Sequence, residues 1–263
     1  MKETFGHGID VSQHNGVIRR NETAKAIDFA IIRAGFGKNN IDRTAVYNVL
    51  ECQRNKIPFG LYWFSYAFNT KMALDESNFL CDFADKYAPA LPLFFDFEYD
   101  SDLYAEKNGY KLSGSQRKEI AQAFLNNVEK RGYFACLYTN IDYLNKGFRP
   151  LTDRFAVWLA QWGIAAPSIS CAFWQNSDNG RIAGIDGNVD TNVAYKNFTA
   201  LNNINKRDQQ KEEIIKKQWE RYYKLGLEII KGKYGNGETR KKKLNEEGYD
   251  YTFAQAVVNW LVM

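Results

Sequence analysis

The hydrophobic and polar positions of this chain follow two rhythms, short apolar runs and longer stretches with helical spacing. A short apolar run bounded by Gly, Pro or polar residues predicts a buried strand, whereas apolar residues three or four positions apart predict an amphipathic helix. The strand pattern occurs at residues 8–11, 29–33, 59–66, 93–100, 134–139, 155–160, 172–176 and 189–193.

Helical spacing fills the gaps between several of these strands, at residues 44–56, 72–87 and 113–131, with a short helix near 141–144. Alternation of strands and helices predicts a parallel sheet with helical crossovers. Roughly eight strands in one domain favour the α/β class and a (β/α)8-like barrel of the TIM type. Because loops replace long helices in the last third of this domain, we expect an irregular barrel that lacks several helices.

The polar stretch at residues 201–210 predicts a domain boundary. We therefore expect a barrel domain at 1–200, a linker at 201–212 and a small three-helix module at 213–263. In this module Tyr222 and Ile229 share a helical face, residues 238–247 form a second helix, and a capping box at Thr252-x-x-Gln255 predicts the start of a third.

Charge is distributed unevenly between these parts. Residues 205–263 hold 13 lysines and arginines and 9 acidic residues, which accounts for the whole net charge of +4. A basic tail on a neutral domain points to an anionic partner of the tail, such as a cell-wall polymer or a nucleic acid.

Several classes of protein are disfavoured by the composition. Four widely spread cysteines without a Cys-x-x-Cys pair predict small buried hydrophobic residues in a chain made in a reducing compartment, and no metal or other cofactor. Two histidines are too few for a zinc hydrolase or a Ser-His-Asp triad. We expect no signal peptide and no membrane insertion, because no apolar segment follows the first residues and no run has transmembrane length.

Two acidic residues stand near the end of the apolar strand predicted at 93–100. Strand side chains alternate between faces, so Phe94, Asp96 and Glu98 are expected on one face. Like charges this close in an apolar wall do not both ionise easily, so one pKa should rise. A protonated carboxylic acid beside an ionised one is what cleavage of a glycosidic bond requires.

Other candidate residues fall at the ends of predicted strands, namely Asp10, Tyr62, Tyr138 and Asp190. In (β/α)8 barrels the chemistry lies at the carboxyl ends of the strands. We therefore expect these side chains to meet Asp96 and Glu98 there. Asp186 competes with Asp190, because both acids lie in one short segment.

The first 200 or so residues resemble the family 25 glycoside hydrolases, lysozymes that cleave bacterial peptidoglycan. The resemblance rests on motifs that occur in order and at family-like spacing: Gly8-Ile9-Asp10-Val11-Ser12, Phe29-Ala30-Ile31-Ile32-Arg33-Ala34-Gly35, Gly60-Leu61-Tyr62-Trp63-Phe64-Ser65, Phe95-Asp96-Phe97-Glu98, Trp158-Leu159-Ala160-Gln161-Trp162, Phe173-Trp174-Gln175 and Val189-Asp190-Thr191-Asn192. The tail resembles the three-helix wall-binding repeat of some phage lysozymes, through Ile230-x-Gly232-x-Tyr234-Gly235-Asn236-Gly237, Arg240, Leu244 and Gly248-Tyr249-Asp250-Tyr251.

This resemblance implies an N-acetylmuramidase, which cleaves the β-1,4 bond between N-acetylmuramic acid and N-acetylglucosamine. It implies that Glu98 is the general acid, that Asp96 assists it, and that Asp10 and Asp190 are the other acids of the groove. The Asp-x-Asn match favours Asp190 over Asp186. The resemblance also implies sugar-contacting residues beside the acids, at Tyr62, Phe64 and Tyr138, while Trp158 and Trp174 are either stacking platforms or core residues.

Three functions are compatible with these patterns: a peptidoglycan hydrolase, a non-catalytic wall-binding protein on a lysozyme-like barrel, and a nucleic-acid-binding tail. Intact Asp96 and Glu98 argue against the second, and the acids interleaved in the tail argue against the third. The expected partner is bacterial peptidoglycan. A wall-lytic domain without a signal peptide favours a phage-type enzyme, made in the cytoplasm and acting on the wall after release by another protein.

The stereochemical course stays open at this level. Asp10 or Asp190 could act as the base of an inverting enzyme. Alternatively, the N-acetyl group of the substrate attacks the anomeric carbon while Asp96 orients it, which retains the configuration. We favour the second course.

Overall fold

The computed structural model describes residues 4–16, 18–199 and 209–262. The chain divides into two compact units, residues 1–205 and residues 206–263. Each is described separately. The linker expected at 201–212 falls outside the described residues up to 208, and from Gln209 onward the chain is already helical.

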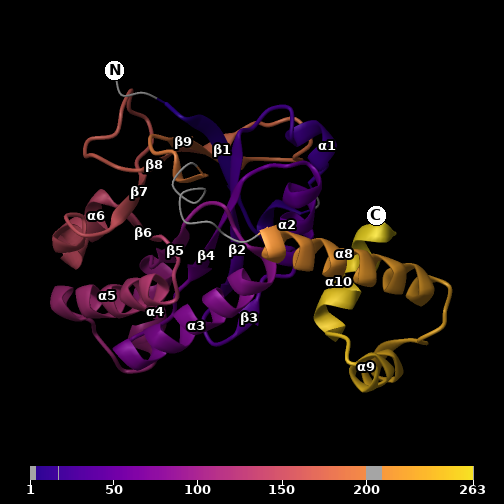
Figure 1. The fold of residues 1–263 in the computed structure, drawn as a ribbon. Helices are drawn as coiled ribbons and strands as arrows, with labels where there is room; N and C mark the ends of the chain where they lie inside the picture. Colours follow the sequence, from indigo (N-terminus) through magenta and orange to yellow (C-terminus); the bar gives the residue numbers. More distant parts are fainter. Residues whose placement is uncertain (1–3, 17, 200–208, 263) are drawn as a thin grey trace. The chain divides into compact units, whose positions relative to one another are not determined.

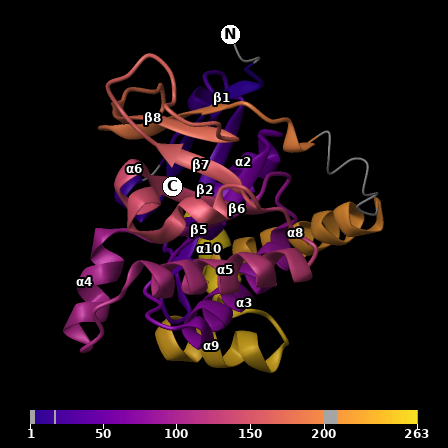
Figure 2. The same ribbon diagram turned by 90° about the vertical axis from the view of Figure 1, so that its left-hand side faces the viewer.

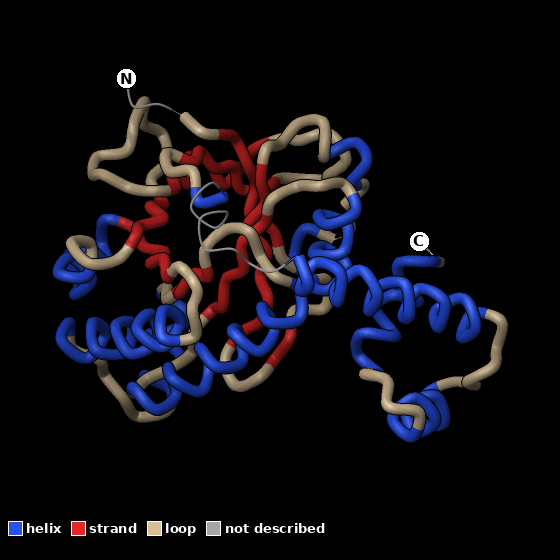
Figure 3. Tube along the Cα trace, viewed as in Figure 1, coloured by secondary structure: helices blue, strands red, loops and turns tan. Residues whose placement is uncertain are grey.

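The first unit is built on a closed barrel of eight strands (Figures 1 and 3). The order around the barrel is β1–β9–β8–β7–β6–β5–β4–β2, and a pairing of β1 with β2 closes it. The strands are β1 (Gly6–Val11), β2 (Phe29–Phe36), β4 (Phe59–Phe64), β5 (Leu93–Asp96), β6 (Ala135–Asn140), β7 (Ala156–Ala160), β8 (Phe173–Gly180) and β9 (Val189–Ala194). A two-residue strand, β3 (Asn40–Ile41), pairs antiparallel with β2.

The barrel strands β1, β2, β4, β5, β6, β7 and β8 pair in parallel, and β9 runs antiparallel to both of its neighbours. The long helices α2 (Ala45–Arg54), α3 (Thr70–Tyr87) and α5 (Gly114–Lys130) are the crossovers of β2, β4 and β5. Figures 1 and 2 show α3 and α5 side by side along the outside of the barrel. Only loops connect β7 to β8 and β8 to β9 in the described chain. The predicted irregular α/β barrel that lacks several helices is confirmed.

Short elements fill the remaining connections. They are η1 (Gln13–Asn15), α1 (Arg20–Thr23), α4 (Tyr99–Lys107), α6 (Ile141–Tyr143), the π-helical turn η2 (Leu144–Phe148) and η3 (Arg149–Leu151). A capping box begins α5, as the sequence Ser113-x-x-Gln116 indicates. The Gln116 side chain accepts a hydrogen bond from the backbone N–H of Ser113, and the backbone N–H of Gln116 donates to the Ser113 hydroxyl. The helix α4 was not predicted, because it exposes its larger apolar side chains and so has no apolar stripe toward a core.

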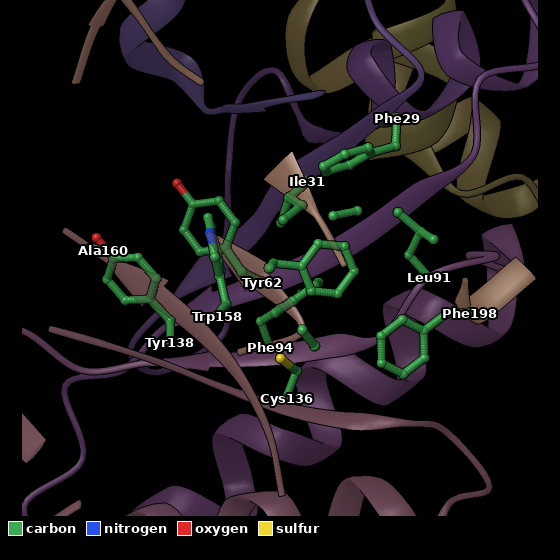
Figure 4. Packing of buried hydrophobic residues seen from close by; sticks show 13 residues of the cluster. Phe29, Ile31, Tyr62, Leu91, Phe94, Cys136, Tyr138, Trp158, Ala160 and Phe198 are labelled. Carbon is green, nitrogen blue, oxygen red and sulfur yellow. The ribbon is translucent and has the colours of Figure 1, made fainter. Parts of the chain in front are cut away.

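The barrel interior is filled by a hydrophobic cluster that contains the side chain of Phe94 (Figure 4). Phe95 points to the other face, where its ring packs 4.9 Å from that of Phe124 on α5. The predicted alternation along this strand is therefore present. Figure 4 also shows that Tyr62, Tyr138 and Trp158 gather at one end of the cluster, which forms the floor of the pocket described below.

The second unit contains three helices, α8 (Gln209–Ile230), α9 (Gly237–Glu246) and α10 (Tyr251–Leu261). Helix α10 packs on α8, where the rings of Tyr222 and Phe253 lie 4.3 Å apart. The absence of a side chain at Gly226 permits this approach, because a Cβ there would lie 2.7 Å from Leu261. Helix α10 begins at Tyr251 with Asp250 as its N-cap, so the start predicted from Thr252 was wrong. Asp250 takes this role because its carboxylate accepts the backbone N–H of Phe253.

Candidate active site

Asp10 and Asp190 lie directly opposite each other in the barrel wall. They are register partners in the antiparallel ladder of β1 and β9. Asp10 stands near the carboxyl end of β1, whereas Asp190 is the second residue of β9. The prediction that Asp190 lies at the carboxyl end of its strand was therefore wrong. Because β9 runs antiparallel, its start lies at the same barrel edge as the carboxyl ends of the other strands.

Asp96 and Glu98 come from two different elements. Asp96 is the last residue of β5, and Glu98 is the N-cap of α4, so the expectation that both lie on one strand was wrong. The strand ends and α4 begins at this point because the hydroxyl of Ser101 accepts a hydrogen bond of 3.0 Å from the backbone N–H of Glu98, the N-cap residue. The two carboxyls nevertheless contact each other through a side-chain hydrogen bond.

Burial changes the acid–base behaviour of all four carboxyls. Desolvation raises the pKa of Asp10 to about 6, of Glu98 to about 7 and of Asp190 to about 8. The pKa of Asp96 is raised well above its ordinary value, first by burial and then by the negative charge of Glu98. Asp96 and Glu98 therefore share a proton near neutral pH instead of ionising together.

A hydrogen-bond network connects the acids to the aromatic floor. The side-chain amide nitrogen of Gln175 donates to Asp10 at 3.0 Å and to Asp190 at 3.3 Å, and its oxygen accepts from the hydroxyl of Tyr138 at 3.1 Å. Asn192 donates to Asp10 at 2.8 Å and accepts from the indole N–H of Trp158 at 2.7 Å. The network fixes the orientation of the Asp10 carboxylate.

A buried cation, Arg33, lines the same pocket as Asp96. The Nε of Arg33 on β2 binds Asp42 at 2.7 Å, and Asp42 is held in turn by the backbone N–H groups of Gln13 and Thr44. The charge of Arg33 opposes the rise of the pKa of Asp96. Two buried atoms, Nη2 of Arg33 and Oδ1 of Asp96, have no hydrogen-bond partner among the described residues. A buried donor and a buried acceptor thus remain available at the bottom of the pocket.

These residues surround an open pocket of about 560 Å³. The acids Asp10, Asp96, Glu98 and Asp190 all line it, as do the predicted sugar-contacting residues Tyr62, Phe64 and Tyr138. The competing acid Asp186 lies elsewhere, exposed and paired with Arg19 at 3.1 Å.

The two tryptophans differ in position. Trp158 lines the floor of the pocket but is 1% exposed, so its ring belongs mainly to the core. Trp174 is not among the residues that line the pocket. Its strand neighbours Phe173 and Gln175 face the barrel interior, so the Trp174 side chain points outward, where its indole N–H donates to the Gln161 carbonyl at 2.7 Å.

Sequence reasoning missed Gln175, Asn192, Arg33 and Asp42 as parts of this site. A signal was present for two of them, because Gln175 and Asn192 each lie two residues after another inward-facing residue of the same strand, Phe173 and Asp190 respectively. Among the described residues, no group of three or more His, Cys, Asp or Glu side chains is arranged to hold a metal ion. No helix of the described chain is long and apolar enough to cross a membrane.

The pattern that defines the glycosyl hydrolases family 25 matches residues 9–185, which covers the barrel from within β1 through β8 and includes Asp10, Asp96 and Glu98 but not Asp190. The chain belongs to glycosyl hydrolase family 25. This family 25 chain is thus a glycoside hydrolase, and the family together with its lysozyme relatives supports a peptidoglycan hydrolase.

Three relatives place the family 25 domain among known proteins. Lysozyme M1 of Streptomyces globisporus is 26% identical over 198 residues, which is 70% of this chain and 66% of that protein. The protein YegX of an Escherichia coli O6:H1 strain is 28% identical over 199 residues, 71% of this chain and 68% of its own. The crystal structure of a lysozyme from Streptomyces coelicolor superposes with a TM-score of 0.60 at 26% identity, covering 71% of this chain and 90% of that one.

A second pattern, the CW_7 repeat, matches residues 224–262. It covers the end of α8 and the whole of α9 and α10. The predicted wall-binding repeat at the C-terminus of the family 25 chain is thereby confirmed.

Proposed function

We propose that this family 25 enzyme is an N-acetylmuramidase, which cleaves the β-1,4 bond on the reducing side of N-acetylmuramic acid in peptidoglycan. One observation carries the proposal, the pair of contacting carboxyls Asp96 and Glu98 in an open pocket, both with a raised pKa. Such a pair holds a proton at neutral pH, and protonation of the leaving oxygen is the step that an unactivated glycoside needs.

Glu98 is the proton donor in this proposal. It is the more exposed member of the pair, and the pKa of about 7 leaves it protonated in a large fraction of molecules near neutral pH. The leaving oxygen of the glycosidic bond takes this proton as the bond to the anomeric carbon breaks. Glu98 then removes a proton from the incoming water, which regenerates the acid.

Asp96 acts on the acetamido group of the substrate. Its Oδ1 is a buried acceptor that has no hydrogen-bond partner in the part of the chain that the structure describes, and an amide N–H of the substrate is the kind of donor that satisfies it. This hydrogen bond favours the ionised form of Asp96 and so moves the shared proton onto Glu98. The acetamido oxygen attacks the anomeric carbon, and the charge of Asp96 stabilises the positively charged ring that forms.

Asp10 and Asp190 serve as a second layer. The charge of Asp10 raises the pKa of Asp96, and the charge of Asp190, when that residue is ionised, raises the pKa of Glu98. Gln175 and Asn192 hold Asp10 in place. The CW_7 repeat in the second unit attaches the enzyme to the wall, so its place of action is the bacterial cell wall after release from the cell that makes it.

The new reducing ends identify the bond that is cut. Purified peptidoglycan is digested, reduced with borohydride and hydrolysed, and the reduced amino sugars are analysed by mass spectrometry. An N-acetylmuramidase produces muramitol. Glucosaminitol would show that the other glycosidic bond is cleaved, and absence of any new reducing end would favour a wall-binding protein on an inactive barrel.

A further inference from the structure

Arg33 brings a positive charge into a pocket that otherwise gathers acids. On β2 the alternate residues Phe29 and Ile31 belong to the cluster in the barrel interior, so strand alternation directs Arg33 inward as well. The pairing of β2 with β4 shifts in register between Arg33 and Gly35, directly after this position. Arg33 lines the pocket and is only 8% exposed. The strand therefore delivers a buried charge to the pocket.

The guanidinium of Arg33 is held in one place by Asp42. Its Nε donates to the Asp42 carboxylate at 2.7 Å, and Asp42 is 2% exposed. Asp42 also accepts the backbone N–H of Gln13 at 3.0 Å, and both the backbone N–H and the hydroxyl of Thr44, at 2.9 Å and 2.8 Å. The Nη2 of Arg33 has no hydrogen-bond partner among the described residues. The ion pair is thus fixed, while part of the guanidinium is left to act on the acids of the pocket.

The surroundings of the Asp96–Glu98 pair are otherwise acidic or uncharged. The other titratable side chains of the pocket lining are Asp10, His14, Arg33, Tyr62, Tyr66, Asp100, Tyr138 and Asp190. Burial raises the pKa of all three tyrosines, so their hydroxyls are uncharged near neutral pH. An arginine stays protonated in proteins, and Arg33 is the one lysine or arginine among the described residues of this lining. It therefore supplies the permanent positive charge beside the pair.

The pair can work only while it holds one proton. Glu98 needs a proton to give and Asp96 needs a negative charge, so a pair with two protons or with none is inactive. The charges of Glu98 and Asp10 raise the pKa of Asp96 and so favour the doubly protonated pair, whereas Arg33 opposes this rise. A buried positive charge displaces both protonation steps of such a pair to lower pH.

We propose that Arg33 is a positioning residue for the proton of the Asp96–Glu98 pair, because its buried charge sets the pH range in which the pair holds a single proton. Arg33 acts on the reaction through the pair and needs no contact with the substrate. Asp42 completes the arrangement by anchoring the guanidinium. This inference rests on the proposed function, which gives the two carboxyls their roles.

The dependence of kcat/KM on pH, measured on a soluble peptide-free muramyl glycan, tests the proposal. The two limbs of the bell-shaped curve report the protonation of groups in the free enzyme. Arg33→Met removes the charge, so we expect both limbs to move to higher pH by about one pH unit. Arg33→Lys keeps the charge, so its limbs should stay close to those of the wild type.

Arg117→Met is the matched control. Arg117 on α5 binds Asp102 at 2.9 Å in an ion pair that is largely buried, but it does not line the pocket, so its loss should leave the curve in place. Arg33→Met combined with Asp42→Asn replaces the single variant if that variant does not fold, because no buried carboxylate is then left unpaired. Its limbs should move in the same direction by a smaller amount, since the whole ion pair is removed.

A titration without substrate separates this inference from the proposed function. NMR of the side-chain carboxyls of isotope-labelled protein follows Asp96 and Glu98, whose titrations should move to higher pH in Arg33→Met as the limbs do. Limbs and titrations that stay in place in Arg33→Met, or that move equally in Arg33→Lys or Arg117→Met, overturn the role of Arg33. A wild type that cleaves no muramyl glycan overturns the proposed function instead, while the NMR titration still decides on Arg33.

Discussion

Asp10 and Asp190 are cross-strand partners, and a single nitrogen of Gln175 donates hydrogen bonds to both of their carboxyls. Their side chains are also hydrogen-bonded to each other. This bond opposes the rise of the Asp10 pKa that burial causes, and it adds to the rise of the Asp190 pKa. Asp190 therefore holds the proton of this pair. Two pairs of acids thus share protons around one pocket, Asp10 with Asp190 and Asp96 with Glu98.

Gln175→Met tests the network that holds Asp10. The substitution keeps the volume but removes the donor to both carboxyls, so we expect the free energy of unfolding to fall by about 1–3 kcal/mol. Urea denaturation measures it. Tyr138→Phe is the control, because it removes only the hydroxyl that donates to the Gln175 oxygen. If Tyr138→Phe proves the more costly change, Gln175 is not the centre of the network.

The raised pKa values predict how stability depends on pH. The ordinary pKa values of 3.8 for Asp10 and Asp190 and 4.5 for Glu98 apply to the unfolded chain, and the folded values are about 6, 8 and 7. At a pH between the unfolded and the folded pKa of each carboxyl, the folded protein therefore binds more protons than the unfolded chain. The free energy of unfolding then falls as the pH rises from 5 to 8. Thermal unfolding across this range measures the slope.

Asp190→Asn should make the free energy of unfolding fall less steeply with pH, because the substitution removes one of the carboxyls whose pKa is raised on folding. The matched control is Asp186→Asn. The pKa of Asp186 is lowered by its hydrogen bond to Arg19, so it titrates below this window and its loss should leave the slope unchanged. A slope that is identical in the wild type and Asp190→Asn would contradict the raised pKa of Asp190.

Removal of residues 206–263 separates cleavage from wall attachment. Residues 1–205 form a compact unit of their own, so we expect the shortened protein to fold and to cleave soluble glycans at the full rate. Binding to insoluble walls in a sedimentation assay should weaken, because the CW_7 repeat is lost. Equal sedimentation of the full-length and shortened proteins would show that the repeat does not bind walls.

The role assigned to Asp96 predicts retention of configuration. Attack by the acetamido oxygen followed by water gives two inversions at the anomeric carbon, so the first product formed is the β-anomer. NMR observation of a defined oligosaccharide during cleavage identifies it. An α-anomer as first product would instead point to direct attack of water with Asp10 or Asp190 as the base.

Periodicity predicted the barrel well because burial determines both the fold and the pattern. Phe94 and Phe95 point to opposite faces as their alternation requires, and Ser113 with Gln116 caps α5 as the motif indicates. The helix α4 could not be predicted in this way. Tyr99, Leu103 and Tyr104 are exposed on it, so no apolar stripe marked it as a helix.

The sequence predicted which acidic residues form the site, but it predicted less well how the chain positions them. Asp10, Asp96, Glu98 and Asp190 do line one pocket. That Glu98 caps a helix, and that Asp190 begins an antiparallel strand, depends on chain direction and on local turns that residue spacing does not reveal. The parts played by Gln175, Asn192 and Arg33 depend on strand register, which brings together residues distant in the sequence.

The general-acid role of Glu98 is tested most directly by the dependence of rate on the leaving group. Wild type and Glu98→Gln are compared on wall glycan and on a 2,4-dinitrophenyl glycoside of the same disaccharide, whose leaving group departs without a proton. We predict that the kcat/KM of Glu98→Gln falls about 10²–10⁴-fold on the glycan, because the proton donor is gone, and little on the dinitrophenyl substrate. The value of kcat/KM is compared because it reports departure of the leaving group, which precedes the step in which Glu98 takes a proton from water. An equal loss on both substrates, or full activity on the glycan, would contradict the assignment of Glu98 as the acid.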